Sequence, residues 1–378
     1  MVRGGSASGL KKKAESGPDR DRWIVRTLSG WFSRSARRLP WRTSPRKAYP
    51  SLVSEFMLQQ TQVSRVLEKF GPFLARFDSV DNLARADEAD VLAAWSGLGY
   101  YRRARLLHAC AKAIAGEHGG EIPRTAGALE ELPGIGRYTA GAIASIVFGE
   151  RAAIVDGNVC RVLQRLDACR GHAGDKRVTE WAWKRAAHLV SLTSRGKQVA
   201  RFNEGLMELG ATVCTPDSPR CGSCPLGDAC VARARGLTDD IPAPKPRAKR
   251  SIVHHDVAVV HRLKATGGVE YLLEQRPTRG LWAGMWQPPA REGNYLPAKA
   301  ALAEVLLKLG LDAIGGGEKV DPIESTFQTT HREVRFRAWP ILLDAADMKA
   351  KGKRWVAVSA LATIGISNAH RRLLERVR

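Results

Sequence analysis

Four cysteines near residue 220 have a spacing that predicts metal chemistry. They follow the pattern Cys-x6-Cys-x2-Cys-x5-Cys and are Cys214, Cys221, Cys224 and Cys230. Four thiolates this close together can surround one metal centre, and both zinc and a [4Fe–4S] cluster accept four Cys ligands. Structural zinc sites usually pair two short Cys-x2–4-Cys knuckles, which the longer gaps here fit poorly. The pattern therefore predicts a structural metal centre and leaves the identity of the metal open.

A glycine-rich turn at residues 132–140, with the sequence LPGIGRYTA, predicts an anion site. Pro133 cannot continue a helix, because it lacks the N–H group and its ring clashes with the preceding turn. Gly134 and Gly136 permit positive φ and leave their backbone N–H groups uncovered. A helix is expected from Tyr138 to Phe148. Bare amides at a helix N-terminus favour an anion such as DNA phosphate, although an ordinary turn between two helices could have the same sequence.

The charge of the chain favours a polyanionic partner. Its 378 residues contain 60 Lys and Arg against 38 Asp and Glu, which gives a net charge of +22. Such an excess is typical of nucleic-acid-binding proteins, although a generally basic proteome would also produce it. No run of about 20 apolar residues occurs, so no membrane span is expected. We expect a DNA-binding monomer, located in the cytoplasm at the nucleoid if bacterial, and otherwise in the nucleus or mitochondria.

Helical patterns fill the first part of the chain, and strand patterns follow a proline-rich segment. Apolar spacing predicts helices over 51–77, 157–168, 176–193 and 198–213, and a helical pair within 88–116. Short apolar runs at 257–260, 271–273 and 334–339 predict strands, with helices near 298–309 and after Asn368. The predicted organisation is a disordered basic tail (1–22), a helical domain (23–235), an extended linker (236–250) and an α+β domain (251–378).

Several motifs, in this order, resemble one known family. The hairpin, the downstream Asp156 and the four-cysteine pattern resemble the iron–sulfur DNA glycosylases of the endonuclease III superfamily. Four further stretches are similar to the adenine DNA glycosylases of the MutY type, namely LPWR (39–42), SEFMLQQT (54–61), GLGYY (97–101) and VDGNV (155–159). The stretch GLWAGMW (280–286) resembles the start of that family's Nudix-like domain. The resemblance covers residues 22–375.

The resemblance implies a fold and a cofactor. The first part of the chain would be a mostly α glycosylase domain, with a helix–hairpin–helix at about 126–149. An iron–sulfur loop at 214–230 would hold one [4Fe–4S] cluster per chain. The C-terminal part would be an α+β Nudix-like domain that reads the damaged base. It has no run of glutamates resembling the Nudix hydrolase motif, so we expect it to hydrolyse nothing.

The resemblance also implies that the chain removes adenine from DNA and leaves an abasic site. Glu55 would protonate N7 of adenine, and Asp156 would stabilise the oxocarbenium-like cation or bond transiently to C1′, a division of labour like that in glycoside hydrolases. Tyr138 and Asn158 would position Asp156 and the reacting centre. Relatives that also cleave the strand carry Lys where this chain has Tyr138, so a monofunctional enzyme is expected and a pyrimidine glycosylase/lyase is the alternative. Apolar neighbours should raise the pKa of Glu55, and Asp156 is also a good N-cap.

Recognition residues follow from the same resemblance. The base must leave the duplex before Glu55 can reach it. Arg42 and Glu204 would contact the adenine, Trp41 would line its pocket, and Gly134 and Gly136 would bind phosphate. The residues expected to act at the opposite, damaged guanine and in the base stack are Gln60, Thr61, Leu98 and Tyr100.

The C-terminal domain departs from the family in one loop. Family members usually have Phe-Ser-His there, and this chain has Phe327-Gln-Thr-Thr330-His331, so Phe327 or Thr329 would take the place of the usual Phe.

The expected partner is double-stranded DNA with adenine opposite 8-oxoguanine or guanine. A non-catalytic DNA-binding or redox module is a further alternative, and the presence of both Glu55 and Asp156 argues against it.

Overall fold

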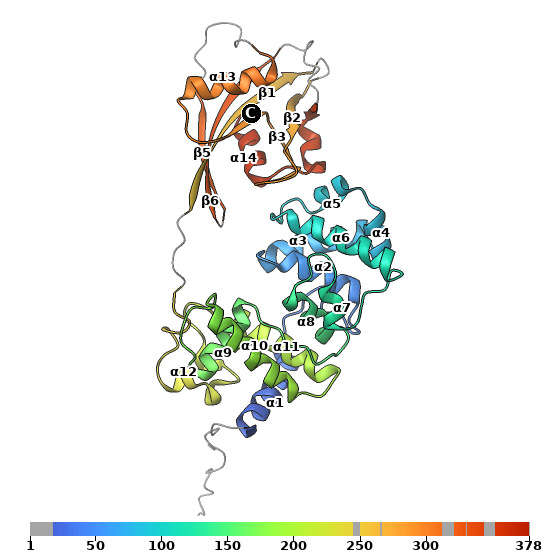
Figure 1. Cartoon of the computed structure of the whole chain (residues 1–378), viewed down its shortest axis with the longest axis vertical. Coiled ribbons are helices and arrows are strands. Elements are labelled where there is room, and N and C mark those ends of the chain that lie inside the picture. The colour runs from blue at the N-terminus through green and yellow to red at the C-terminus, as the bar shows by residue number, and fades with distance from the viewer. Residues whose placement is uncertain are drawn as a thin grey trace, which may run out of the picture. The chain divides into compact units, whose positions relative to one another are not determined.

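The chain forms two compact units in this computed structural model (Figure 1), which describes residues 18–244, 250–264, 267–311, 321–329, 331–343 and 352–377. Unit 1 comprises Met1–Glu55 and Ala113–Pro246, and unit 2 comprises Phe56–Lys112 and Arg247–Arg378. The chain therefore passes between the units within helices α2 (Ala48–Leu58) and α6 (Arg102–Glu117). These units differ from the predicted division, because residues 56–112 of the predicted helical domain belong to unit 2.

Unit 1 is helical. Its other elements are α1 (Pro18–Ser35), α7 (Ala126–Glu130), α8 (Arg137–Ile146), α9 (Gly157–Asp167), α10 (Lys176–Ser191), α11 (Lys197–Thr212), η1 (Cys221–Ser223), η2 (Gly227–Ala229) and α12 (Val231–Ala234). The predictions for α9, α10 and α11 are confirmed to within two residues at each end. Helices α7 and α8 with the turn between them form the expected helix–hairpin–helix.

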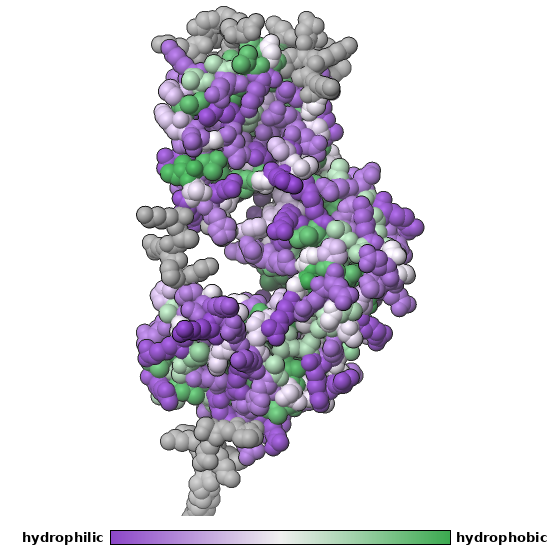
Figure 2. Space-filling model, in the orientation of Figure 1, coloured by the Kyte–Doolittle hydropathy of each residue, from purple (hydrophilic) through white to green (hydrophobic). Residues whose placement is uncertain are grey.

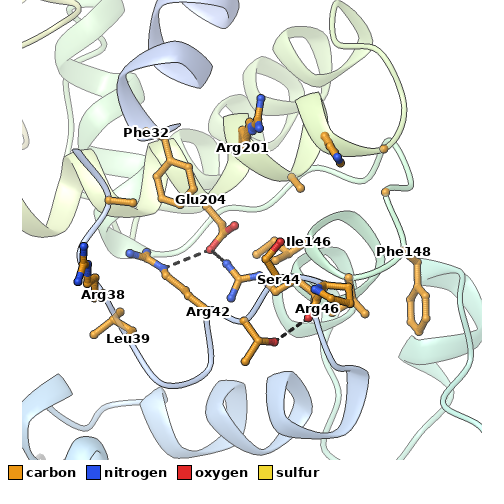
Figure 3. A pocket seen from close by; sticks show the side chains of 18 of the residues that line it. Phe32, Arg38, Leu39, Arg42, Ser44, Arg46, Ile146, Phe148, Arg201 and Glu204 are labelled. Atoms are coloured by element: carbon orange, nitrogen blue, oxygen red, sulfur yellow. Dashed lines mark hydrogen bonds and ion pairs between the residues drawn. The ribbon is translucent and has the colours of Figure 1, made fainter. Parts of the chain in front are cut away.

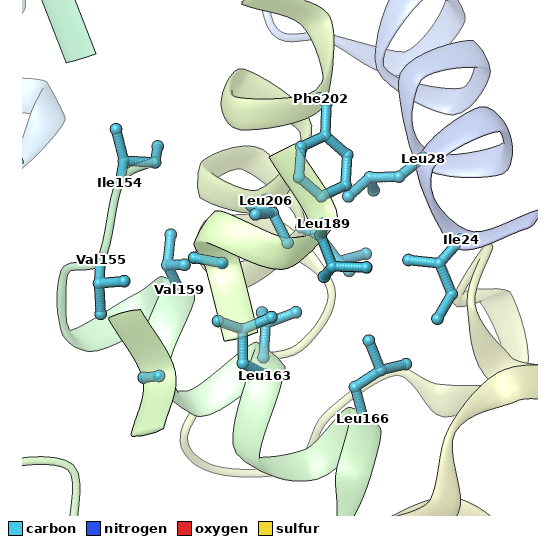
Figure 4. Packing of buried hydrophobic residues seen from close by; sticks show 14 of the residues in the cluster. Ile24, Leu28, Ile154, Val155, Val159, Leu163, Leu166, Leu189, Phe202 and Leu206 are labelled. Atoms are coloured by element: carbon cyan, nitrogen blue, oxygen red, sulfur yellow. The ribbon is translucent and has the colours of Figure 1, made fainter. Parts of the chain in front are cut away.

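The core of unit 1 lies between α1, α9, α10 and α11. Apolar side chains at helical spacing place one stripe of each helix inside, where it is removed from water. Figure 4 shows this packing, with residues that include Ile24, Leu28, Val159, Leu163, Leu189, Phe202 and Leu206, all fully buried. The core fixes the start of α9 and the middle of α11, which both carry predicted site residues.

Two predicted boundaries of unit 1 are wrong. Helix α1 begins at Pro18, so residues 18–22 are helical rather than part of a tail; residues 1–17 lie outside the described residues. Asp19 and Asp21 in the first turn suit the positive end of the helix, and the Asp21 carboxylate also pairs with Arg185. The first part of the predicted linker is anchored, because Ile241 is buried and its carbonyl accepts a hydrogen bond of 2.6 Å from Arg165 Nε.

The N-terminal part of unit 2 contains the helices α3 (Val63–Arg76), α4 (Val80–Arg85), α5 (Glu88–Ala94) and α6. The prediction of one helix over 51–77 is wrong, because α2 and α3 are separated at residues 59–62. Gln60 has φ of 55°, which no helix accommodates. The Phe56 and Met57 carbonyls at the end of α2 instead accept hydrogen bonds of 2.8 Å from Arg103.

The C-terminal part of unit 2 is a mixed sheet between helices. Its strands are β1 (Ser251–Leu263), β2 (Val269–Gln275), β3 (Trp286–Gln287), β4 (Ala290–Gly293), β5 (Ile323–Gln328), β6 (Arg332–Leu342) and β7 (Lys353–Ala357). The order is β3-β2-β1-β6-β5, with β4 on β1 and β7 on β2, and only the β1–β6 pair is parallel among the described strands. The three predicted strands are confirmed and correspond to parts of β1, β2 and β6.

Alternation along the strands divides this sheet into two faces. Val257 and Val259 face one apolar cluster that includes α14 (Asn368–Arg376), whereas Ala258 and Val260 face another that includes α13 (Ala298–Leu309). Figure 1 shows the two helices on opposite sides of the sheet. The α+β class and both predicted helices are therefore confirmed.

The surface is mainly polar. Figure 2 shows a largely hydrophilic face with small, separate hydrophobic areas. The large apolar residues that are exposed lie scattered along the chain and are Leu67, Tyr100, Ile252, Leu263, Tyr295, Leu307 and Leu342. In the part of the chain that the structure describes, no helix combines the length and apolar character needed to cross a bilayer.

The close packing of α8 gives a stability prediction. A Cβ atom on Gly141 would lie 2.3 Å from the backbone oxygen of Ala153, so Gly141→Ala forces α8 away from its neighbour. We expect the free energy of unfolding to fall by about 1–3 kcal/mol. The matched control is Gly127→Ala in α7, where a Cβ meets nothing within 4 Å and reduced backbone entropy of the unfolded chain stabilises by about 0.4–1 kcal/mol. Urea unfolding of both variants measures the difference, and equal stability of the two would contradict it.

Candidate active site

An open cavity of about 850 Å³ lies in unit 1 beside the predicted adenine-binding residues. It is bounded by the segment before α2, the end of α8 and the start of α11, and its lining includes Phe32, Arg38, Leu39, Arg42, Arg46, Phe148, Lys197, Arg201 and Glu204. Figure 3 shows Arg42 and Arg46 extending from the segment before α2 toward Glu204 on α11. Two of the predicted residues, Arg42 and Glu204, therefore lie together.

Alternating charges form a buried network at this place. Arg42 Nε lies 3.2 Å from Glu204 Oε1, and Arg42 Nη2 lies 2.8 Å from Glu208 Oε2. Arg46 pairs with the same oxygen of Glu204, and Arg37 Nε lies 2.7 Å from Glu208 Oε1. Burial opposes ionisation of Glu208, but the hydrogen bonds from Arg37 and Arg42 outweigh it and lower its pKa. The carboxylates thus exist in a dry environment because guanidinium groups surround them.

Glu55, on α2, has the raised pKa that the sequence predicts. Burial raises the pKa of this carboxyl group to about 7, and the nearby Asp156 and Glu204 carboxylates add to the rise. Arg46 and Arg42 act in the opposite direction. Glu55 can therefore hold a proton near neutral pH and deliver it to a base, as a general acid does.

Asp156 is both an N-cap and a buried carboxylate. It precedes α9, and its Oδ1 accepts a 2.7 Å hydrogen bond from Val159 N, so the predicted cap is confirmed. Burial raises the pKa of Asp156, whereas the backbone N–H groups of Val159 and Asn158 and the Arg161 cation limit this rise. The Asp156 carboxylate is close enough to raise the pKa of Glu55. When the pair takes up one proton, Glu55 therefore binds it and Asp156 stays charged.

Tyr138 and Asn158 lie near this pair in different ways. Burial, followed by the charges of Glu55 and Asp156, raises the pKa of Tyr138, whose hydroxyl lies 3.9 Å from Met207 Sδ. The tyrosine therefore stays neutral, near enough to both carboxyl groups to feel their charges. The Asn158 side-chain oxygen accepts a 2.8 Å hydrogen bond from Arg161 Nη2.

The glycine hairpin needs glycine at only one of its two predicted positions. Gly134 has φ of 78°, in the left-handed region that disfavours side chains. Gly136 has φ of −97° and is the N-cap of α8, so it does not use the positive φ that glycine permits. Both glycines are exposed, and the amides at the start of α8 carry no side-chain cap. The hairpin therefore keeps the features of an anion site.

The four cysteines line one small cavity, together with residues that include Arg165 and Arg233. The pKa of Cys224 is raised to about 11, mainly by burial, with smaller contributions from the neighbouring Cys214, Cys230 and Cys221 thiols. Within the described ranges, no group of three or more His, Cys, Asp or Glu side chains is arranged to hold a metal ion. The four thiols nevertheless share one cavity, as the ligands of a common centre must.

Helix α9 holds the cysteine loop from inside. Arg165 donates to the Thr215 and Pro216 carbonyls at 2.6 and 2.9 Å, and its own carbonyl lies 3.3 Å from Cys230 Sγ. Arg161 Nε donates to the Cys214 carbonyl at 2.9 Å. These guanidinium groups satisfy loop carbonyls that no regular secondary structure would satisfy.

Unit 2 brings together the residues predicted for the base stack and the lesion. Thr61 Oγ1 lies 3.3 Å from the Leu98 carbonyl, and Arg103 donates to both. Gln60 and Tyr100 have φ of 55° and 47°, and both are exposed. Leu98 is buried, so its side chain supports the turn rather than extending from it.

The predicted lesion loop is the hairpin between β5 and β6. The Phe327 ring lies 5.9 Å from the Trp282 ring and packs against the core of the sheet. Thr329 closes the hairpin, since its N–H donates to the Arg332 carbonyl at 2.8 Å. His331 is exposed, and Thr330 lies outside the described residues.

Sequence reasoning missed the residues that compensate buried charge. Arg46, Arg37 and Glu208 complete the network around Glu204, and Arg103 joins the two loops of unit 2. A signal for the network was present, because Glu208 follows Glu204 by one helical turn and residues 37–46 contain four arginines. Arg103 gave no comparable signal, since its partners are mainly backbone carbonyls.

Known proteins are similar to this chain. Residues 53–188 match the family described as "HhH-GPD superfamily base excision DNA repair protein", and residues 259–376 match the NUDIX domain. The adenine DNA glycosylase of Homo sapiens is 32% identical over 92% of this chain and 73% of its own length. That of Mycobacterium tuberculosis (strain ATCC 25618 / H37Rv) is 44% identical over 55% of this chain and 67% of its own.

A solved structure supports the helical fold. A thermostable thymine-DNA glycosylase, 27% identical, superposes with a TM-score of 0.51 over 57% of this chain and 97% of its own. The predicted resemblance and fold class are confirmed. The chain belongs to the adenine DNA glycosylase family, base excision repair enzymes that hydrolyse N-glycosyl bonds.

Proposed function

We propose that the protein is a monofunctional glycosylase that removes adenine paired with 8-oxoguanine or guanine and leaves an abasic site. The observation that carries this proposal is a carboxyl group with a pKa of about 7, Glu55, beside a second carboxyl group fixed as a helix cap, Asp156. Hydrolysis of an N-glycosyl bond needs an acid for the leaving base and a negative charge for the sugar, and these two groups supply both.

The reaction begins with proton transfer from Glu55 to N7 of adenine. The C1′–N9 bond then breaks, the electron pair stays with the base, and positive charge develops on the sugar. The Asp156 carboxylate stabilises this charge or forms a transient bond to C1′. A water molecule then adds its oxygen to C1′, and where Asp156 has bonded to C1′ this bond breaks with its electron pair returning to the carboxylate. The proton that the water loses restores the acid form of Glu55. Tyr138 offers no amine, so the Schiff base that strand cleavage requires does not form there.

Adenine recognition uses the other charged groups of the cavity. Glu204 accepts a hydrogen bond from the exocyclic amine of adenine, and Arg42, which is 3.2 Å from Glu204, orients this carboxylate. Trp41 is buried and is not among the residues that line the cavity, and its backbone carbonyl accepts a hydrogen bond from Arg46. Double-stranded DNA is the substrate, and the α8 hairpin binds its phosphate at Gly134 and Gly136.

Single-turnover excision tests the two carboxyl groups. We expect Glu55→Gln to lower the rate by about 10²–10⁴-fold, because it has no proton to give. Asp156→Asn should lower it by about 10²-fold or more while keeping the helix cap, which Asn also forms. With the pKa of Glu55 at about 7, the wild-type rate should fall as pH rises above 7, because the acid form is lost.

The control for this experiment is Glu68→Gln, which removes an exposed carboxylate on α3. It should leave the rate and its pH dependence unchanged. A near wild-type rate in either catalytic variant would reject the assignment of that residue.

The cysteine cavity supports a [4Fe–4S] cluster. Cys214, Cys221, Cys224 and Cys230 would hold the four iron atoms. When bound, the cluster supplies a rigid inorganic centre that cross-links residues 214–230. The arginines of α9 already hold the carbonyls of this loop, so its ends are placed for cluster binding.

Visible absorption and iron content of the purified protein test this cofactor. We expect iron and sulfide at about four each per chain, with the broad visible absorption of iron–sulfur proteins. Cys224→Ser should lower both and reduce the melting temperature, because the loop loses its cross-link. Cys169→Ser, at a thiol outside the cavity, is the control and should change neither. Zinc in place of iron would exclude the cluster.

Lesion reading is assigned to the β5–β6 hairpin. His331 is exposed there, and its backbone carbonyl, not its side chain, accepts the 3.1 Å hydrogen bond from Ser251 N. The side chain is therefore available to a base, and we propose that Thr330, the preceding residue in the sequence, acts with it. Phe327 packs on Trp282, so it supports the hairpin from the core side.

Substrate preference tests this role. We expect His331→Ala to reduce the preference for adenine opposite 8-oxoguanine over adenine opposite guanine roughly twofold to tenfold, the value of one hydrogen bond. The control is Glu324→Ala, an exposed position elsewhere on β5. Equal preference in His331→Ala and the wild type, measured by single-turnover excision on both duplexes, would reject lesion reading by this residue.

A further inference from the structure

Arg46 connects the segment before α2 with Glu204 on α11 through one side chain. It lies in the segment before α2, outside the LPWR and SEFMLQQT motifs. Its Nη1 donates to the Trp41 carbonyl at 2.7 Å, and its Nη2 pairs with Glu204 Oε1. A guanidinium group has a planar fork of donors, so one residue can hold both partners in a fixed geometry. Lysine, with one charged nitrogen, cannot bridge them in the same way.

The ion pairs of Glu204 with Arg42 and Arg46 both use the same carboxylate oxygen. Arg42 Nε and Arg46 Nη2 both take the Oε1 atom of Glu204, and Oε2 takes part in neither contact. The side chains of Arg46 and Glu204 are 16% and 9% exposed, so water competes little with these bonds. The carboxylate is therefore held in one orientation, with one oxygen committed to arginine.

Arg46 also acts on the catalytic acid. The charged or titratable groups that affect Glu55 come from every neighbouring element: Asp156 before α9, Glu204 on α11, Arg46 and Arg42 before α2, and Tyr138 on α8. Arg46 precedes Arg42 among the cations that counteract the rise in the pKa of Glu55. Its single charge thus offsets part of the effect of two carboxylates.

We propose that Arg46 is the positioning residue of the adenine site, which orients Glu204 toward the exocyclic amine of the base and balances the charge around Glu55. This inference rests on the proposed function. Two variants separate the two effects of Arg46, the orientation of Glu204 and the charge near Glu55. Lys in place of Arg46 keeps the charge but cannot bridge both partners, whereas Gln removes the charge.

The test compares Arg46→Gln, Arg46→Lys and the wild type in single-turnover excision of adenine opposite 8-oxoguanine from pH 5 to 9. Loss of the cation in Arg46→Gln should shift the midpoint of the alkaline decline upward by roughly 0.5–1 pH unit. Arg46→Lys should keep the wild-type midpoint. A second duplex, with a purine that lacks the 6-amino group in place of adenine, tests orientation: both variants should lose part of the wild-type preference for adenine over this purine.

The matched control is Arg177→Gln, which removes one exposed cation from α10, outside the residues that line the cavity. It should keep both the midpoint and the base preference. An unchanged midpoint in Arg46→Gln, or an equal shift in Arg177→Gln, would overturn the charge effect. If circular dichroism shows that Arg46→Gln is unfolded, Arg46→Lys decides: an unchanged adenine preference overturns the orienting role. Lack of adenine release by the wild type would instead overturn the proposed function itself.

Discussion

Burial of several carboxyl groups in one small volume is the constraint on which unit 1 depends. Glu55, Asp156, Glu204 and Glu208 all lie in poorly hydrated surroundings, where an unpaired charge would cost several kcal/mol. The chain meets this constraint in three ways. Arginines surround Glu204 and Glu208, a helix N-terminus stabilises Asp156, and Glu55 can hold a proton near neutral pH. Glu55 is thus the carboxyl group with the least compensation, which is why its pKa is raised to about 7.

Helix α9 connects this constraint to the cysteine loop. Its first turn fixes Asp156, and its later turns place Arg161 and Arg165 against the loop carbonyls. The apolar face of the same helix, with Val159 and Leu163, is fully buried in the core. Because the helix cannot move without losing these contacts, the position of the cap is set by core packing on one side and by the loop on the other. A stable core is therefore a condition for the geometry of the carboxyl pair.

The sequence predicted motifs and regular helices well, and failed where a distant residue decides the local conformation. Helices α9 to α11 followed from apolar spacing, because their cores are amphipathic stripes. The break at Gln60 did not, since Arg103, more than 40 residues later, takes the carbonyls that would continue α2. The prediction that Ile241 belongs to an extended linker failed for the same reason, because its hydrogen-bond partner, Arg165, lies far away in the sequence. The sequence pointed to candidate site residues that belong to a motif, whereas it did not point to Arg46 and Glu208, whose contacts depend on the charge of a partner.

Backbone strain in unit 2 fits the roles proposed for its loops. Gln60 and Tyr100 are non-glycine residues in the left-handed region, a conformation that costs of order 1–3 kcal/mol and persists only where surrounding contacts enforce it. Arg103 supplies such contacts, because it is buried, bonds to both loops and stacks with its guanidinium 5.4 Å from the Tyr100 ring centroid. Burial even lowers the pKa of this arginine to about 10, so its charge is retained only at a cost. Two costs are therefore paid here, the burial of the Arg103 charge and the strained backbone of Gln60 and Tyr100. Apolar residues packed in the same place would stabilise the fold without these costs. The arrangement is therefore explained by DNA binding rather than by stability alone.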